Sequence, residues 1–279
     1  MLWRSGARVL SARVLSARAA PSPAARRAFG CACPGSGGVS GGSGTGGPTS
    51  ISETFRKVLS EDDAELSHLL DNNRRWVDKQ NAADPDFFTH LGGGQAPTYL
   101  YIGCSDSRVP ANEILGLPAG EVFVHRNVGN LVVNTDLNAA SVIEYAVEHL
   151  DVKHIIVTGH YDCGAVKASV EKQDLGMLEN WLRNIRDVHR THFQALHEIT
   201  NPEAKHRRLV ELNVIEQCLN LYKTGVVQRK RLKTFEEGPH AYPRVHGLVF
   251  DPKDGILKRL PVHFKDEIGE MGREVYDLY

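Results

Sequence analysis

Apolar residues along this chain occur either in short continuous runs or in longer stretches with helical periodicity. The short runs cover residues 98–103, 121–125 and 154–159, and each has the length and composition of a buried strand. The longer stretches repeat apolar residues every three or four positions, which predicts helices over residues 53–80, 136–150, 177–197 and 213–224. Two further runs separated by the Asp254–Gly255 turn predict a closing hairpin over residues 245–250 and 256–260.

Strands that alternate with helices are typical of α/β proteins whose strands run parallel. We therefore expect an α/β fold with a largely parallel β-sheet flanked by helices. The helix over residues 53–80 precedes the first strand and is expected to form an N-terminal helical extension.

Candidate metal ligands follow two of the predicted strands directly. Cys104 comes after the first strand, and His160 and Cys163 come after the third. Because ligands of such sheets bind beyond the carboxyl ends of the strands, we expect these three side chains to meet in one crevice. Two thiolates and one imidazole form a soft donor set that suits Zn²⁺, one ion per chain. The alternative is that all three are unrelated core residues, since buried cysteine is common.

Three protein ligands leave a fourth coordination position open, which distinguishes catalytic zinc sites from closed structural ones. Asp106 and Arg108 lie two and four residues past the first ligand. Asp106 could accept a hydrogen bond from zinc-bound hydroxide and orient it, or it could ligate the metal and close the site. A bidentate contact with Arg108 would favour the first role. The pair could also be only a salt bridge that stabilises a loop.

Charge is unevenly distributed along the chain, although the net charge is only −1. Six of the 33 basic residues are arginines within the first 52 positions, which contain no acidic residue. The rest of the chain therefore holds 27 basic and 34 acidic side chains, which argues against a nucleic-acid partner.

No apolar run is long enough for a membrane span. Five widely spaced cysteines indicate metal-binding thiols in a reducing compartment, not a disulfide framework.

The N-terminal composition predicts a targeting segment and a linker before the folded domain. Residues 1–34 are rich in Arg, Ala and Ser, as in an organelle transit peptide. Mitochondrion is the preferred destination, chloroplast is the alternative, and a tail without targeting function is a third possibility. Residues 35–50, with eight glycines between positions 35 and 47, predict a flexible linker. The catalytic domain is then expected over residues 51–279.

Four motifs together resemble the β-class carbonic anhydrases. They are GCSDSRVP at 103–110, HRNVGN at 125–130, SVIEYAVEHL at 141–150 and GHYDCGAV at 159–166, and the resemblance extends from about residue 55 to residue 260. It implies a zinc-dependent lyase, a carbonate dehydratase that reversibly hydrates carbon dioxide to bicarbonate and a proton. It also implies that Cys104, His160 and Cys163 are the zinc ligands and that Asp106 and Arg108 form the catalytic dyad.

The same resemblance implies a substrate pocket and an oligomer. Gln95 matches the side chain that hydrogen-bonds substrate, Phe123, Val128 and Tyr145 match the pocket walls, and Gly164 follows the last ligand as in the family pattern. A homodimer or homotetramer with paired sheets is expected.

One subgroup of the family is inhibited by bicarbonate at a separate site through a Trp and a Tyr. Tyr101 and Phe250 stand at those places here, so we expect no bicarbonate gating.

Two other functions fit the same residues. The zinc site could act on another small electrophile, such as carbonyl sulfide or carbon disulfide. Alternatively, the chain could be a catalytically silent zinc-binding oligomer, against which the intact Asp106–Arg108 pair argues.

Overall fold

The computed structural model describes residues 51–264, with side chains from Leu66 onward. The predicted transit peptide and linker lie outside the described residues, as does the end of the predicted catalytic domain after residue 264. The chain divides into two compact units, residues 1–67 and 68–279. This boundary falls within the first helix, α1 (Ile51–Ala83), which confirms the helix predicted over residues 53–80.

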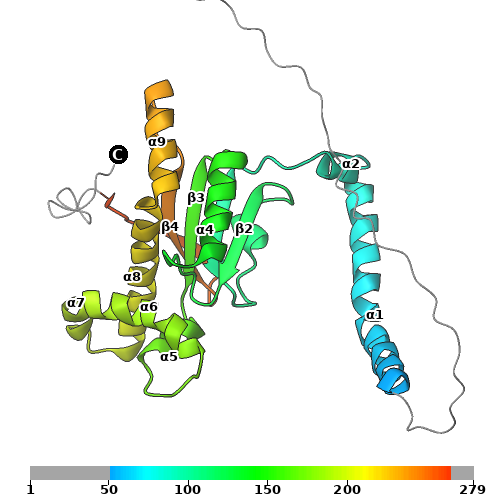
Figure 1. Ribbon diagram of the computed structural model, residues 1–279, viewed down its shortest axis with the longest axis horizontal. Helices are drawn as coiled ribbons and strands as arrows, with labels where there is room; N and C mark the ends of the chain where they lie inside the picture. The colour runs from blue at the N-terminus through cyan, green and yellow to red at the C-terminus, as the bar shows by residue number, and fades with distance from the viewer. Residues whose placement is uncertain (1–50, 265–279) are drawn as a thin grey trace, which may run out of the picture. The chain divides into compact units, whose positions relative to one another are not determined.

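A five-stranded sheet forms the centre of the second unit (Figure 1). Its strand order is β2-β1-β3-β4-β5, and all neighbours pair in parallel except β4 and β5, which are antiparallel. The bounds are β1 (Tyr99–Cys104), β2 (Val122–Asn127), β3 (His154–His160), β4 (Arg244–Asp251) and β5 (Ile256–Leu260). The predicted strands, the closing hairpin and the largely parallel sheet are therefore confirmed.

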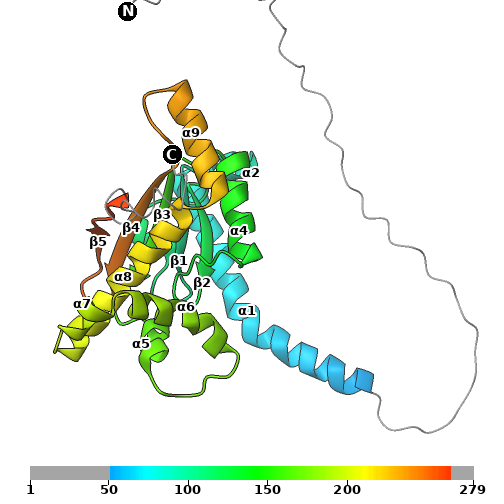
Figure 2. The same ribbon diagram turned by 60° about the vertical axis from the view of Figure 1, so that its left-hand side comes forward.

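Helices occupy most of the remaining chain. Their bounds are α2 (Phe87–Gly92), α3 (Ala111–Leu115), α4 (Leu137–Glu144), the π-helical turn η1 (Tyr145–His149), α5 (Gly164–Val170), α6 (Leu178–Thr191), α7 (Phe193–His197), α8 (Pro202–Tyr222) and α9 (Gly225–Glu237). Figures 1 and 2 show α4 and α8 on the same face of the sheet. No helix in the described range 51–264 has the length and apolar character needed to cross a membrane.

Two of the sequence predictions for helices need correction, and one helix was not predicted. The helix predicted over residues 177–197 is broken at His192 into α6 and α7. The helix predicted over residues 213–224 begins eleven residues earlier, at Pro202, where the side chain of Asn201 accepts a hydrogen bond from the backbone nitrogen of Ala204. The basic stretch at residues 228–233 is part of α9, which was not predicted.

The core lies between the sheet and its covering helices. Leu100, Ile102, Ile155 and Val157 contribute fully buried side chains from β1 and β3. Helix α8 approaches β3 and β4 closely because two glycines face it. A Cβ atom on Gly159 would lie 2.5 Å from Cγ2 of Val214, and one on Gly247 would lie 3.2 Å from Cγ1 of the same residue. The close approach fixes the end of β3, where His160 follows Gly159.

We predict that Gly159→Ala destabilises the protein by about 1–3 kcal/mol, because the added methyl group overlaps Val214. The measurement is urea unfolding of the zinc-loaded protein. In the double variant Gly159→Ala/Val214→Ala the methyl group has room, so the double variant should lose less stability than the two single variants lose together. Strictly additive losses would show that this contact does not set the helix–sheet distance.

Candidate metal centre

The parallel register of the sheet brings the three predicted ligands together. Cys104 ends β1, His160 ends the neighbouring strand β3, and Cys163 lies in the turn before α5. Their donor atoms all lie within 4.8 Å of one another, and the two sulfurs are 3.9 Å apart. All three residues are buried, with His160 fully inaccessible. Within the described residues this is the one cluster of three His, Cys, Asp or Glu side chains arranged to hold a metal ion.

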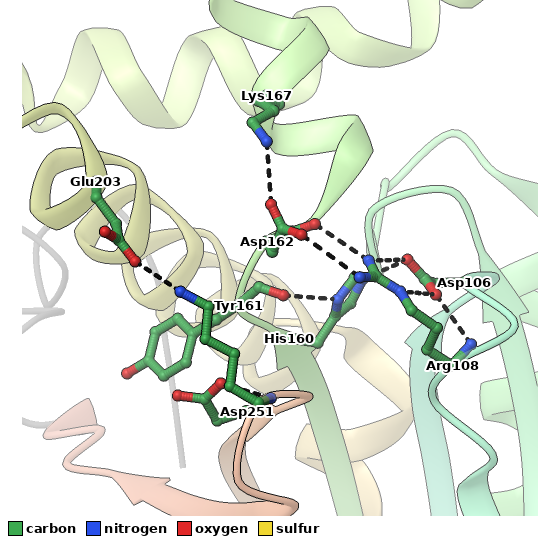
Figure 3. Close-up of polar contacts among 9 residues, drawn as sticks. Asp106, Arg108, His160, Tyr161, Asp162, Lys167, Glu203 and Asp251 are labelled. Carbon is green, nitrogen blue, oxygen red and sulfur yellow. Dashed lines mark hydrogen bonds and ion pairs between the residues drawn. The ribbon is translucent and has the colours of Figure 1, made fainter.

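The histidine has its metal-binding nitrogen free. Nδ1 of His160 lies 3.1 Å from the carbonyl oxygen of Tyr161 (Figure 3). A carbonyl only accepts hydrogen bonds, so Nδ1 must carry the proton and Nε2 must hold the lone pair. Nε2 is buried and has no hydrogen-bond partner. Because buried polar atoms are seldom left unpaired, this nitrogen indicates that a group absent from the protein chain belongs here.

The two thiols differ in acidity because they interact with each other. A hydrogen bond from Cys163 lowers the pKa of Cys104 to about 4, although burial acts in the opposite direction. The resulting thiolate, together with burial, raises the pKa of Cys163. Backbone amides of Ala165 and Val166, in the first turn of α5, partly offset that rise. A divalent cation between the sulfurs would supply the charge that lets both ionise.

Asp106 and Arg108 form a two-point ion pair beside the ligands. Nε of Arg108 donates to Oδ1 of Asp106 at 3.0 Å, and Nη2 donates to Oδ2 at 2.8 Å. The backbone nitrogen of Arg108 also donates to Oδ1 at 2.9 Å, which closes a turn around the carboxylate. These hydrogen bonds hold the pKa of Asp106 well below its ordinary range. The same carboxylate lies 3.7 Å from Nε2 of His160, so it faces the metal-binding atoms.

Two further residues hold this pair in place. Asp162, which the sequence reasoning did not single out, accepts hydrogen bonds from Nη1 of Arg108 through its carboxylate at 3.4 Å and from Nη2 through its carbonyl at 3.3 Å (Figure 3). Its position between two predicted ligands was the only available signal in the sequence. Arg126 on β2 donates to the carbonyl oxygens of Cys104 and Asp106, at 2.8 and 2.5 Å. These contacts fix the first part of the loop after β1, from Cys104 to Arg108.

A cavity of about 710 Å³ opens on the outer side of Arg108. Asp162, Lys167 and His206 also line it, whereas the three ligand residues do not. Of the dyad and the ligand set, only Arg108 therefore borders this cavity.

The predicted pocket residues fall into two groups. Val128 and Gly164 are close to the ligands along the chain: Gly164 follows Cys163 and begins α5, and Val128 follows Asn127, which pairs with Cys104. The backbone amide of Gly129 helps to lower the pKa of Cys104, and Trp181 donates to the carbonyl oxygen of Val128 at 2.7 Å.

Phe123, Tyr145 and Gln95 lie away from the ligands within one chain. The rings of Phe123 and Tyr145 pack 5.7 Å apart, and Phe123 precedes Asn127 on β2 by four residues, which corresponds to about 13 Å. Gln95 is exposed and precedes the first residue of β1, whereas Cys104 is the last residue of that strand. A single copy of the chain therefore does not bring these three side chains to the ligand set.

Comparisons with known proteins agree with this geometry. The family model described as carbonic anhydrase matches residues 99–257, which is more than half of the chain. A carbonic anhydrase of Emericella nidulans is 53% identical over 210 residues, which cover 75% of this chain and 89% of that protein. A carbonic anhydrase of Candida albicans is 36% identical and covers 71% of this chain and 68% of that protein.

Solved structures show the same fold. One of two tetrameric β-carbonic anhydrases from Sordaria macrospora superposes with a TM-score of 0.66 at 37% identity, covering 71% of this chain and 97% of that one. A β-carbonic anhydrase of Coccomyxa, solved with acetazolamide, gives a TM-score of 0.64 at 42% identity, covering 70% of this chain and 86% of that one.

The ligand cluster, the sheet and these similarities lead to one assignment. The chain belongs to the β-class carbonic anhydrases, a family of carbonate dehydratases.

Proposed function

We propose that this chain hydrates carbon dioxide reversibly to bicarbonate and a proton at a zinc ion held by Cys104, His160 and Cys163. The observation that carries the proposal is the convergence of three buried donor atoms within 4.8 Å, next to a carboxylate that Arg108 holds. The donor set fits zinc, because sulfur and imidazole nitrogen are its preferred ligands and one ligand nitrogen is otherwise unpaired. Bound there, zinc supplies the Lewis acidity that makes water nucleophilic near neutral pH.

Asp106 serves as the hydrogen-bond acceptor that orients the attacking water. Its low pKa keeps it ionised, so it accepts and does not donate at any pH at which the protein works. Oδ2 lies 3.7 Å from the ligand nitrogen of His160, which places the carboxylate directly beside the metal-binding atoms. Because Arg108 occupies both carboxylate oxygens, Asp106 is held back from ligating the metal itself.

Arg108 is a positioning residue for that carboxylate. Asp162 contacts it from the opposite side, so the guanidinium lies between two acidic groups and its orientation is fixed. Side-chain exposure of 48% leaves Arg108 open to the neighbouring cavity.

A homo-oligomer would complete the substrate pocket. β2 is an edge strand, and Val124 on it is exposed together with the nearby ring of Tyr145. Unpaired edges with apolar side chains favour pairing with another chain. We infer that a second copy covers β2 and that Gln95, Phe123 and Tyr145 line the pocket only in that assembly.

The mitochondrial destination, with chloroplast as the alternative, stays a prediction from the N-terminal composition.

Removal of one ligand should remove the metal. Cys104→Ala is expected to lose stoichiometric zinc, because two remaining donors hold zinc far more weakly than three. The measurement is the zinc content per chain after dialysis, by atomic emission. Cys218→Ala is the matched control, since Cys218 is an equally buried thiol outside the cluster and should keep its zinc. One zinc per chain in Cys104→Ala would refute the ligand assignment.

Replacing Asp106 should separate metal binding from catalysis. Asp106→Asn is expected to keep one zinc per chain and to lower turnover by about 10²- to 10⁴-fold, the usual contribution of a positioned proton acceptor. Stopped-flow measurement with a pH indicator gives the hydration rate, and oxygen-isotope exchange between carbon dioxide and water identifies the substrate. Asp187→Asn, which removes an exposed carboxylate paired with Arg190, is the control and should leave the rate unchanged. If Asp106→Asn hydrates carbon dioxide at the normal rate, Asp106 has no part in the mechanism.

Oligomerisation is tested at the edge strand. Val124→Lys places a charge on the exposed face of β2 and should shift the molar mass, measured by light scattering, toward that of a single chain. Val170→Lys adds the same charge to an exposed apolar position on α5 and should not change the mass. An unchanged mass in both variants would exclude β2 from the contact.

A further inference from the structure

A second large cavity lies at the opposite end of the sheet from the metal centre. It has a volume of about 650 Å³ and is bordered by α9, the start of β4 and the segment after β5. Arg244, which lines it, is the first residue of β4, whereas Phe250, near the end of that strand, pairs with His160. Six residues of strand separate the two levels, which corresponds to about 20 Å. The cavity is therefore distinct from the site described above.

The charges that line this cavity are all of one sign. Three arginines, Arg231, Arg244 and Arg259, come from three different elements, and no aspartate or glutamate lines the space. None of the three forms an ion pair within the part of the chain that the structure describes, whereas Arg108, Arg186 and Arg207 each pair with a carboxylate. Uncompensated arginines around a concave surface attract anions.

Arg231 is held rigidly with part of its hydrogen-bonding capacity unused. Its Nη1 donates to the carbonyl oxygens of Ala241 and Pro243, at 3.3 and 2.7 Å, and its guanidinium lies 4.9 Å from the ring centre of Tyr222. Its Nε is buried and has no hydrogen-bond partner. Arg231 therefore contributes a fixed positive charge to the cavity wall.

His246, which also lines the cavity, is influenced by two of these arginines. Burial, followed by His154, Arg259 and Arg244, lowers its pKa to about 4. The imidazole also lies 3.0 Å from Nδ1 of His154. Cations that disfavour a proton on this ring favour a negative charge in the adjacent space.

The cavity also has aromatic walls and more room than an inorganic anion needs. Phe264 stacks on Tyr222 with 4.4 Å between ring centres, and the ring of Phe235 is 63% exposed. Both phenylalanines line the cavity, and its volume falls within the usual range for small-molecule sites. Flat apolar surfaces beside arginines suit a ligand with a planar ring and a phosphate group.

We propose that this cavity binds a nucleoside phosphate, with the phosphate on Arg244 and Arg259 and the base against the rings of Phe235 and Phe264. The site adds a ligand of a different class from the substrate of the proposed reaction and does not depend on that reaction.

Isothermal titration calorimetry of the full-length, zinc-loaded protein with ADP tests the proposal. Arg244→Gln and Arg259→Gln should each weaken ADP binding about tenfold, because each removes one charge-assisted hydrogen bond. Both side chains are exposed, so the variants should fold normally. Lys258→Gln is the matched control: it removes the same charge from the adjacent position of β5, on the opposite strand face, where Lys258 lies over the ring of Tyr161. It should bind ADP like the unmodified chain.

Inorganic phosphate serves as the second probe. It should bind at least tenfold more weakly than ADP, since it cannot use the aromatic walls. If Lys258→Gln and Arg259→Gln weaken ADP binding equally, net charge alone accounts for the effect, and the proposal is overturned. Equal affinity for phosphate and ADP would overturn the nucleotide class. Absence of heat with ADP at millimolar concentration would also overturn the proposal, whatever the hydration activity of the protein.

Discussion

The parallel pairing of β1 with β3 is the constraint on which the candidate metal centre depends. Cys104 and His160 are 56 positions apart in the sequence, and only the common register of the two strands brings their side chains to one edge of the sheet. That register is held from the helix side by α8, which approaches β3 closely because Gly159 has no side chain. The packing of α8 against the sheet and the placement of the ligand residues therefore depend on the same contacts.

Without a bound cation, only one of the two ligand thiols ionises readily. In the protein alone, one sulfur becomes strongly acidic because the other donates to it, and the second proton is correspondingly hard to remove. Asp106 cannot relieve this state, because its negative charge is already matched by Arg108. The dyad is thus a charge-matched ion pair that lies beside a ligand set without a compensating charge.

The sequence was sufficient for the sheet and the ligand cluster because both depend on strong local patterns. Buried parallel strands are continuous apolar runs, and the motif residues follow them directly. The start of α8 was missed even though Asn201 and Pro202 carry a helix-start signal, because its first two turns are polar and none of residues 202–208 is buried. α9 was missed because few of its residues are buried and its polar stretch has no clear apolar face.

The substrate pocket could not be predicted in the same way, and Phe123 illustrates why. A motif match gives a role to a residue but does not say which copy of the chain performs it. Phe123 and Tyr145 contact each other, yet the strand register separates them from the ligands of their own chain. The role of Asp162 was not predicted either, because its contact with Arg108 spans 54 positions and depends on two loops that converge only in the folded protein.

The hydrogen bond that fixes His160 has a consequence for how the protein can vary. The partner of Nδ1 is the main-chain oxygen of Tyr161, not a side chain. Every amino acid provides that oxygen, so exchange of residue 161 leaves the imidazole tautomer unchanged. The tautomer of this histidine is therefore insensitive to substitution at the neighbouring position. With a carboxylate partner, the tautomer would also depend on the identity of a second residue.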